Sequence, residues 1–491
     1  MRVAVWLFLC FLALYISTAK AVFEYGDDVS MLQVTQAIVE RRSLNVEPCA
    51  PGSKVGMDGY CYSKYGLGQS LLGIPFYVVG KVLLPLAPVP SIVDERGLVR
   101  AGTIPYLASL LGTVSTAGAV ALLYALSLEL GFSRFGAVAA AFSLGLGTFA
   151  WHYSRTFMSE PTSLVVILLS FYSALRFRNG DGAAWLALSG VGSASSFLLR
   201  STNAAAVAVI ACWILWEMQV RRQGSIRWML INMGVWAAPV LVSLVVFFTY
   251  NLMRFGSPWE TGYGSEAGAF TTPFYVGLYG FILSPGKSLF IYAPITLAGV
   301  VGWFYLRRTQ PIVASVILAL VLAYLLLYSR YYAWYGGGAW GPRFLVPILP
   351  FVTVGVAALV EGRRTPTQWI ALLAIALASL FVQVCSILVP YVPYEAKMEA
   401  TPELFERLLW HPAYSPVLAT ARSLLQAEYP LDVAPTYYSS AALAWLQLGA
   451  LVVAVLLVLG GIAKMCLGSM RRSAGLVGQA MEAEPARMRR E

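Results

Sequence analysis

The chain has very few residues of the kinds that bind transition metals. Only two of its 491 residues are histidines, and its six cysteines include no Cys-x-x-Cys pair. Zinc and haem sites need clusters of these residues at short, regular spacings. The sequence therefore argues against a zinc or haem protein.

Charged residues are also scarce. They make up 12% of the chain, whereas hydrophobic residues make up 58%. Soluble domains have about 25% charged residues, and a chain of this length is too long for one small bundle. We therefore expect an all-α, multi-pass protein of the cell membrane, in contact with the lipid bilayer.

The net charge of +10 has a pattern that does not suggest nucleic-acid binding. The basic residues are spaced along the chain between apolar runs. This spacing is typical of cytoplasmic loops, which carry an excess of Lys and Arg. We predict no nucleic-acid partner.

Hydropathy predicts about twelve membrane-spanning helices. They cover residues 3–22, 104–128, 136–150, 160–175, 184–199, 203–218, 229–250, 289–306, 311–328, 343–360, 367–389 and 441–463. Basic residues such as Arg134, Arg307 and Arg364 fall in alternate connections, which assigns both termini to the cytoplasm. The N-terminal segment imitates a signal peptide, but its length favours an uncleaved first helix.

One further apolar segment, residues 66–86, would reverse this alternation if it crossed the membrane. We therefore expect an interfacial helix on the outer face. The outer loops are then residues 23–103, 251–288 and 390–440. Residues 1–467 form one membrane domain, and 468–491 form a cytoplasmic tail predicted to be disordered. Cys49 and Cys61 share an outer loop, which predicts a disulfide.

The outer edge gathers charged residues beside Gly, Ser and Tyr. They are Asp27, Asp28, Lys64, His152, Arg155, Glu160, Arg200, Arg254, Lys287, Arg330 and Arg343. Such cations suit an anionic ligand, and nearby carboxylates suit a base. Each residue alone has a simpler interpretation: a lone Arg or Lys often reaches for lipid headgroups, and Glu160-Pro161 fits a helix start. Their concentration on one face favours a binding site.

The order of several motifs resembles the GT-C superfamily of polytopic glycosyltransferases, and more narrowly its bacterial O-mannosyltransferase-like and aminoarabinose-transferase-like members. The motifs span about residues 5–360 and include YGDDVSMLQ, YSKYGLGQ, HYSRTFMSEP, FLLRSTNAA, SPGKSLF and GPRFLVP. The resemblance implies a GT-C fold with Asp27 as the base, and with Asp28 and Glu160 as further acids of the catalytic site. It also matches Lys64-Tyr65-Gly66 to an element that opens an outer-face helix.

Chemistry on the outer face constrains the donor. Nucleotide sugars are cytoplasmic, so we expect a polyprenyl-phosphate sugar, transferred to a hydroxyl on a glycan, lipid or protein. The resemblance implies that the transfer inverts the anomeric carbon, although two carboxylates could in principle support a retaining mechanism. We expect Lys64, Tyr65, Arg155 and Arg343 to bind the donor phosphate. Further substrate contacts are expected from His152, Arg200, Arg254, Tyr263 and Lys287.

Two other functions stay open. A flippase for lipid-linked glycans would place ionisable groups inside the spans, and a glycan ligase or polymerase could share the architecture. The sequence predicts no cofactor, but it leaves open whether a divalent cation, Mg²⁺ or Mn²⁺, assists.

Overall fold

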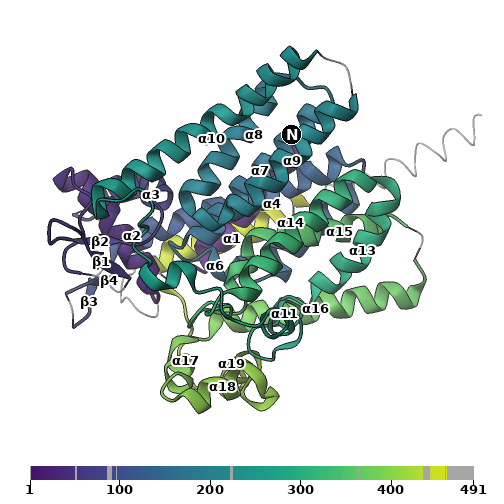
Figure 1. The fold of residues 1–491 in the computed structure, drawn as a ribbon. Helices are drawn as coiled ribbons and strands as arrows, with labels where there is room; N and C mark the ends of the chain where they lie inside the picture. Colours follow the sequence, from purple (N-terminus) through teal and green to yellow (C-terminus); the bar gives the residue numbers. More distant parts are fainter. Residues whose placement is uncertain are drawn as a thin grey trace, which may run out of the picture.

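A bundle of long helices with a folded cap at one end makes up the protein, as seen in a computed structural model (Figure 1). The structure describes residues 2–20, 22–49, 52–85, 91–95, 97–221, 225–362, 364–434, 443–458 and 460–461. The predicted tail, 468–491, lies outside these residues. The predicted all-α class is confirmed, since the strands among the described residues form only two small two-stranded sheets.

Each predicted apolar segment contains a helix. These helices are α1 (Arg2–Ser17), α4 (Thr103–Glu129), α5 (Arg134–Gly147), α7 (Ser159–Arg178), α8 (Ala183–Leu199), α9 (Ala204–Arg221), α10 (Ile226–Phe255), α13 (Ile295–Thr309), α14 (Pro311–Arg330), α15 (Leu349–Glu361), α16 (Pro366–Leu388) and residues 443–458. Within the described ranges, six helical segments are long and apolar enough to cross a membrane. The total of about twelve spans stays a prediction.

Short elements join these helices. They are α6 (Ala150–Tyr153), η2 (Ser201–Asn203), η3 (Gly264–Gly268), α11 (Phe274–Leu283), α12 (Leu289–Tyr292) and η4 (Arg343–Ile348). The predicted outer loop 390–440 folds into α17 (Val392–Met398), α18 (Pro402–Trp410), η5 (Pro412–Tyr414) and α19 (Pro416–Gln426), with residues 435–440 outside the described ranges.

Close helix packing depends on small residues, as is common where lipid replaces water around a bundle. A β-carbon at Gly302 of α13 would lie 1.8 Å from the carbonyl oxygen of Gly355 in α15. The two backbones therefore touch, and a larger residue at Gly302 would push α13 and α15 apart.

The cap at one end is built from the predicted first outer loop. It contains α2 (Gly26–Gln36), η1 (Ala37–Arg41), β1 (Ser53–Val55), β2 (Cys61–Ser63), α3 (Leu67–Leu83), β3 (Ile92–Val93) and β4 (Val99–Ala101). The strands β1 and β2 pair antiparallel, with Ser53 opposite Ser63. The predicted disulfide is confirmed: Cys49 is bonded to Cys61, with their Cα atoms 5.6 Å apart.

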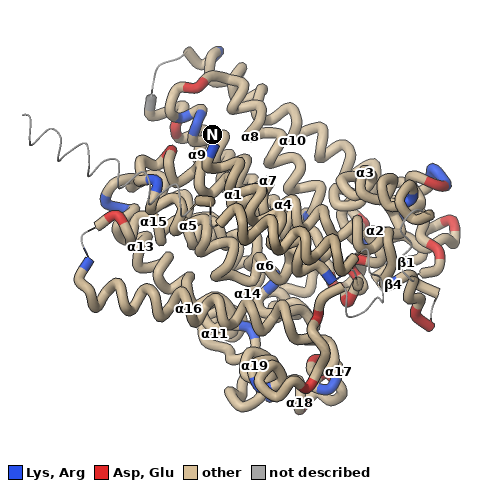
Figure 2. Tube along the Cα trace, turned by 180° about the vertical axis from the view of Figure 1, so that it is seen from behind, with Lys and Arg blue, Asp and Glu red and all other residues tan. Residues whose placement is uncertain are grey.

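The segment 66–86 forms α3, which packs beside α2 and α4. Its place at the membrane surface stays a prediction. Figure 2 shows charged residues gathered toward the ends of the bundle, with long uncharged stretches of helix between them. This distribution is what a bilayer-spanning bundle requires.

We predict that positions 60 and 95, on either side of α3, lie on the same outer face. Both side chains are exposed. Single cysteines placed there, in a Cys212→Ser and Cys466→Ser background, should both react with a membrane-impermeant maleimide in intact cells. Thr309→Cys, in a predicted cytoplasmic turn, should react only after permeabilisation. Labelling of positions 60 and 95 from opposite sides would mean that α3 crosses the membrane.

Candidate active site

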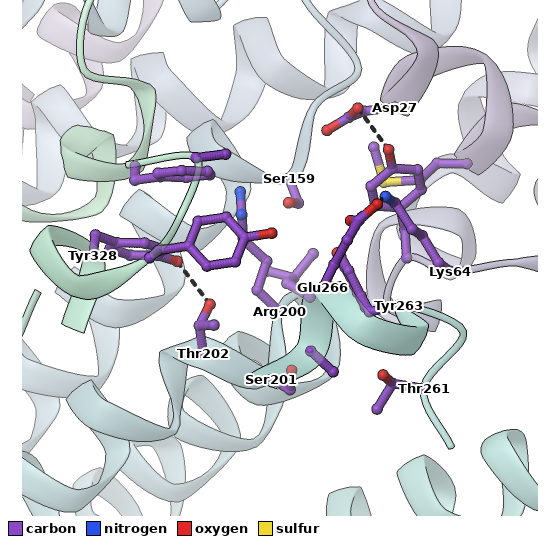
Figure 3. A pocket seen from close by; sticks show the side chains of 18 of the residues that line it. Asp27, Lys64, Ser159, Arg200, Ser201, Thr202, Thr261, Tyr263, Glu266 and Tyr328 are labelled. Carbon is purple, nitrogen blue, oxygen red and sulfur yellow. Dashed lines mark hydrogen bonds and ion pairs between the residues drawn. The ribbon is translucent and has the colours of Figure 1, made fainter. Parts of the chain in front are cut away.

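A cavity of about 430 Å³ opens where the cap meets the bundle (Figure 3). Its walls come from segments far apart in the chain, from the first turn of α2 to the loop before η4. Seven of the twelve predicted site residues line it: Asp27, Lys64, Tyr65, Arg200, Arg254, Tyr263 and Arg343. The fold thus brings together most of the predicted set.

Asp27 lies in the first turn of α2 and presents both carboxylate oxygens to fixed partners. The Tyr65 hydroxyl donates to Oδ1 at 2.7 Å, and Arg343 Nη1 donates to Oδ2 at 3.1 Å. Burial alone would raise the pKa of Asp27, but Arg343 and the Tyr65 hydrogen bond outweigh it, so the pKa lies below its ordinary value. The cavity wall therefore carries an ionised carboxylate.

Asp28 has the opposite environment although it is the next residue. It is 1% exposed, it does not line the cavity, and its Oδ1 has no hydrogen-bond partner within the described structure. Burial, and then the nearby charges of Asp27, Glu160 and Glu24, raise the pKa of Asp28 well above its usual range. The surroundings of Asp28 therefore favour its protonated form, whereas the partners of Asp27 favour its ionised form.

Glu160 holds two cavity arginines from behind the wall. It lies in the first turn of α7, pairs with Arg200 Nη1, and its Oε1 is 4.0 Å from Arg343 Nε. Its side chain is only 2% exposed. Carboxylates and guanidinium groups thus alternate from Asp27 through Arg343 and Glu160 to Arg200.

Lys64 follows β2 directly, so the disulfide-closed hairpin determines its place. Lys64 Nζ lies 2.7 Å from Glu266 Oε2 and 5.0 Å from the centre of the Tyr263 ring. Arg254 braces the same hairpin by donating to the Ser63 carbonyl, and its other bonds go to Asn251 and the Tyr250 carbonyl. Arg254 therefore serves to hold the hairpin in place. Lys64 has one ionic partner among the described residues, Glu266.

Glycine is required in the loop that carries Arg343. Gly336 has φ +81°, and a β-carbon there would lie 2.8 Å from Arg343 Cγ. Only glycine adopts this conformation readily and leaves that space free. The absence of a side chain at Gly336 therefore lets the Arg343 side chain pack against this loop and reach Asp27.

Several cavity residues were not predicted. Glu266 lies three residues after Tyr263 in the same Gly-rich stretch, which is the signal that could have identified it. Thr202 and Tyr328, whose hydroxyls are 2.7 Å apart, lie near helix ends. A tyrosine near a helix end is ordinarily assigned to the membrane interface, so no sequence pattern pointed to these two residues.

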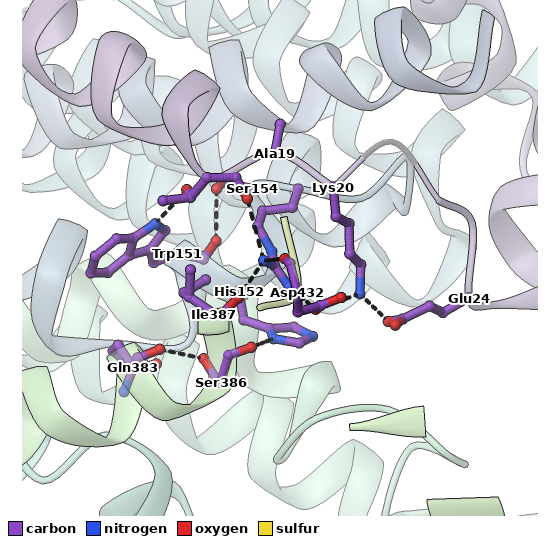
Figure 4. Close-up of polar contacts among 12 residues, drawn as sticks. Ala19, Lys20, Glu24, Trp151, His152, Ser154, Gln383, Ser386, Ile387 and Asp432 are labelled. Carbon is purple, nitrogen blue, oxygen red and sulfur yellow. Dashed lines mark hydrogen bonds and ion pairs between the residues drawn. The ribbon is translucent and has the colours of Figure 1, made fainter. Parts of the chain in front are cut away.

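The predicted phosphate ligand Arg155 lies outside the cavity, in a buried network. Figure 4 shows Lys20, His152 and Asp432 in this network. Its Nη2 is 2.8 Å from Asp432 Oδ2, and its Nη1 donates to the carbonyls of Ile387 and Asp432. Lys20 also pairs with Asp432, at 3.4 Å. Arg155 therefore ties the end of α1 to the segment after α19, and the structure does not bring it to the site.

His152 and Lys287 are also placed behind the cavity. His152 Nδ1 lies 3.2 Å from the Ser386 carbonyl, and its ring stacks on Trp340. Burial, and then the charges of Arg155 and Lys20, lower the pKa of His152 well below its usual range, so it is neutral. Lys287 Nζ donates to the Gly337 and Ala339 carbonyls and so anchors the loop that leads to Arg343.

No group of three or more His, Cys, Asp or Glu side chains in the described part of the chain is placed to hold a metal ion. Both oxygens of Asp27 are already used by Tyr65 and Arg343. The described residues therefore assign no metal site, and the use of a divalent cation stays open.

Comparison with known proteins identifies the fold. No protein-family model and no curated protein matches the sequence. The crystal structure of ArnT from Cupriavidus metallidurans in the apo state matches with TM-score 0.53 and 11% identity, over 87% of this chain and 77% of that chain. The chain has the GT-C fold. The same ArnT bound to undecaprenyl phosphate matches with TM-score 0.51 and 11% identity, over 93% of this chain and 75% of that chain.

The buried network around Asp432 predicts how one substitution changes the stability of the folded protein. Asp432→Asn removes the acid that Arg155 and Lys20 share. Lys20 still pairs with Glu24, but Arg155 then has only carbonyl acceptors among the described residues. Loss of one member of a buried ion pair typically costs about 3–5 kcal/mol. We expect a clear fall in Tm of the purified protein. Asp181→Asn, which breaks an exposed pair with Arg176, should have little effect. Equal shifts in the two variants would contradict this role.

The raised pKa of Asp28 predicts a pH-dependent stability. The unfolded chain loses this proton near pH 4, whereas the folded chain keeps it, so Asp28 lowers the free energy of unfolding as the pH rises above that value. Asp28→Asn is neutral throughout. The Tm of this variant minus that of the wild type should therefore increase from pH 4.5 to pH 8. A difference that does not change with pH would show that Asp28 is ionised in the folded protein.

Proposed function

We propose that the protein is an integral-membrane glycosyltransferase that moves a sugar from a polyprenyl-phosphate donor to an acceptor hydroxyl on the outer face. The observation that carries the proposal is the carboxylate of Asp27, held by Tyr65 and Arg343 in a cavity that cations, hydroxyls, aromatic rings and a second carboxylate, Glu266, also line. The GT-C fold adds weight, because ArnT has been solved with undecaprenyl phosphate bound.

Asp27 is the proposed general base. As the acceptor oxygen attacks the anomeric carbon, its O–H bond breaks and the proton passes to Asp27. The bond from the anomeric carbon to the phosphate oxygen breaks, and its electron pair leaves with the phosphate. This single displacement inverts the anomeric centre. A base must be unprotonated, and the lowered pKa of Asp27 meets this requirement at neutral pH.

The leaving phosphate gains negative charge, so cations placed beforehand would stabilise the transition state. Lys64 and Arg343 are proposed for this role. Arg343 gives Nη1 to Asp27, while its Nε has no hydrogen-bond partner among the described residues. That Nε is buried and lies 4.0 Å from Glu160 Oε1, so Asp27 and Glu160 hold the guanidinium group beside the cavity, where its positive charge would act on the phosphate. Tyr65 is proposed to orient Asp27 rather than to bind phosphate.

Aromatic side chains support a lipid-linked donor. Phe197 of α8 and Phe247 of α10 line the cavity, and their rings are 5.1 Å apart. Farther along α10, Val242 and Val245 are exposed. The cavity therefore has an apolar wall on the side of α8 and α10, and α10 carries further exposed apolar residues, which suits a polyprenyl chain.

Incubation of membranes with a panel of radiolabelled polyprenyl-phosphate hexoses and pentoses would test the proposal. We expect one donor to label an acceptor and to release polyprenyl phosphate. Asp27→Asn keeps the side-chain shape but removes the base, so turnover should fall about a hundredfold or more while donor binding survives. Movement of the donor across the bilayer without cleavage would instead indicate a flippase.

Three further variants assign roles within the site. Lys64→Ala should weaken donor binding as well as turnover, because a phosphate contact exists before the transition state. The loss of donor binding in Glu160→Gln should lie between the losses in Lys64→Ala and Asp27→Asn, because this substitution loosens Arg200 and Arg343 without removing them. A loss of turnover in Asp28→Asn but not in Asp27→Asn would move the base by one residue.

A further inference from the structure

One cavity cation is paired with a carboxylate from an exposed turn. Lys64 Nζ lies 2.7 Å from Glu266 Oε2 (Figure 3). The side chain of Glu266 is 36% exposed, against 2% for Glu160, which pairs with Arg200 from the protein interior. The Lys64 partner can therefore be exchanged more easily than the partner of Arg200.

The turn that carries Glu266 is bound loosely to the rest of the protein. Glu266 belongs to η3 (Gly264–Gly268), which follows Gly262 and begins at Gly264, both with positive φ. The backbone–backbone hydrogen bonds that involve residues 264–268 reach no farther than residues 263–270. The first ties to other elements come at Ala269, whose carbonyl accepts from Tyr332, and at Thr272. The turn can therefore shift without breaking contacts in the bundle.

Lys64 keeps its position when Glu266 is removed. The backbone N–H of Lys64 donates to the Gly52 carbonyl at 3.2 Å, and its ammonium lies 5.0 Å and 5.9 Å from the ring centres of Tyr263 and Tyr65. Rings at these distances attract a cation. The ammonium would therefore remain available to another anion.

A phosphate is the anion that the proposed function brings to this place. A partly enclosed ammonium is costly to leave unpaired, so Glu266 stabilises the empty cavity. A phosphate oxygen at Lys64 would take the position of Glu266 Oε2. One anion replaces another, so the lysine stays paired throughout the exchange.

We propose that Glu266 is an internal competitor for the donor phosphate, which leaves Lys64 when the polyprenyl-phosphate group binds and returns when the phosphate departs. This inference rests on the proposed function. It assigns to Glu266 a part in setting the affinity for donor and product, and it predicts that removal of the carboxylate strengthens binding.

Binding of undecaprenyl phosphate to the purified full-length protein, followed by tryptophan fluorescence, would test the proposal. Glu266→Gln keeps the shape of the side chain and removes its charge. We expect its Kd to fall by roughly two- to fivefold, the range that a partly exposed ion pair supplies. The matched control is Glu260→Gln in the same segment. Glu260 pairs with Lys54 at 3.2 Å and does not line the cavity, so its Kd should not change.

A double-mutant cycle separates direct competition from a general change of charge. In a Lys64→Ala background, Glu266→Gln should no longer strengthen binding. An unchanged or higher Kd in Glu266→Gln alone, or an equal gain in Glu260→Gln, would overturn the competitor role. If the folded wild type bound no undecaprenyl phosphate, the proposed function would fail with it. Binding that is lost in Lys64→Ala but unaffected by Glu266→Gln would overturn the inference alone.

Discussion

The pairing of Asp27 with Arg343 is the interaction on which the site depends. It joins the first turn of α2 to the first residue of η4, 316 residues later in the chain. Glu160 extends this contact to Arg200 and so connects α7 to the junction between α8 and η2. Opposite charges alternate along the series, so no charge is left unpaired where water is partly excluded. This alternation lets a cavity at a membrane hold several ionised groups.

Buried polar anchors hold the loop that supplies Arg343. Lys287 fixes the carbonyls of Gly337 and Ala339, and the Tyr153 hydroxyl donates to the Trp340 carbonyl at 2.7 Å. Behind them, Arg155 and Asp432 connect the N-terminal and C-terminal parts of the chain. These groups contribute rigidity to the site without touching the cavity. A well-fixed arginine is what electrostatic stabilisation of a leaving phosphate would require.

The two adjacent aspartates show how one helix turn gives two carboxyl groups different properties. Consecutive helical residues point about 100° apart, so Asp27 faces Tyr65 and Arg343 while Asp28 faces the interior. Asp27 has two donors to balance its burial, whereas Asp28 is buried beside other acids and its Oδ1 has no donor in the described structure. The difference in charge comes from direction alone, since both residues have the same chemistry.

The sequence by itself determined the helices and part of the site. A hydropathic run of this length must form a helix in a membrane, so each of the twelve segments contains one. The Cys49–Cys61 bond also followed from a local feature, since both cysteines lie in one short polar segment. Tertiary structure alone decided which cations face the cavity. Arg155 and Arg343 look equivalent in sequence, but only Arg343 meets Asp27, because long-range packing directs Arg155 toward Asp432. The fold likewise places Glu266 beside Lys64. The two residues are 202 positions apart, so no local sequence pattern indicates their contact.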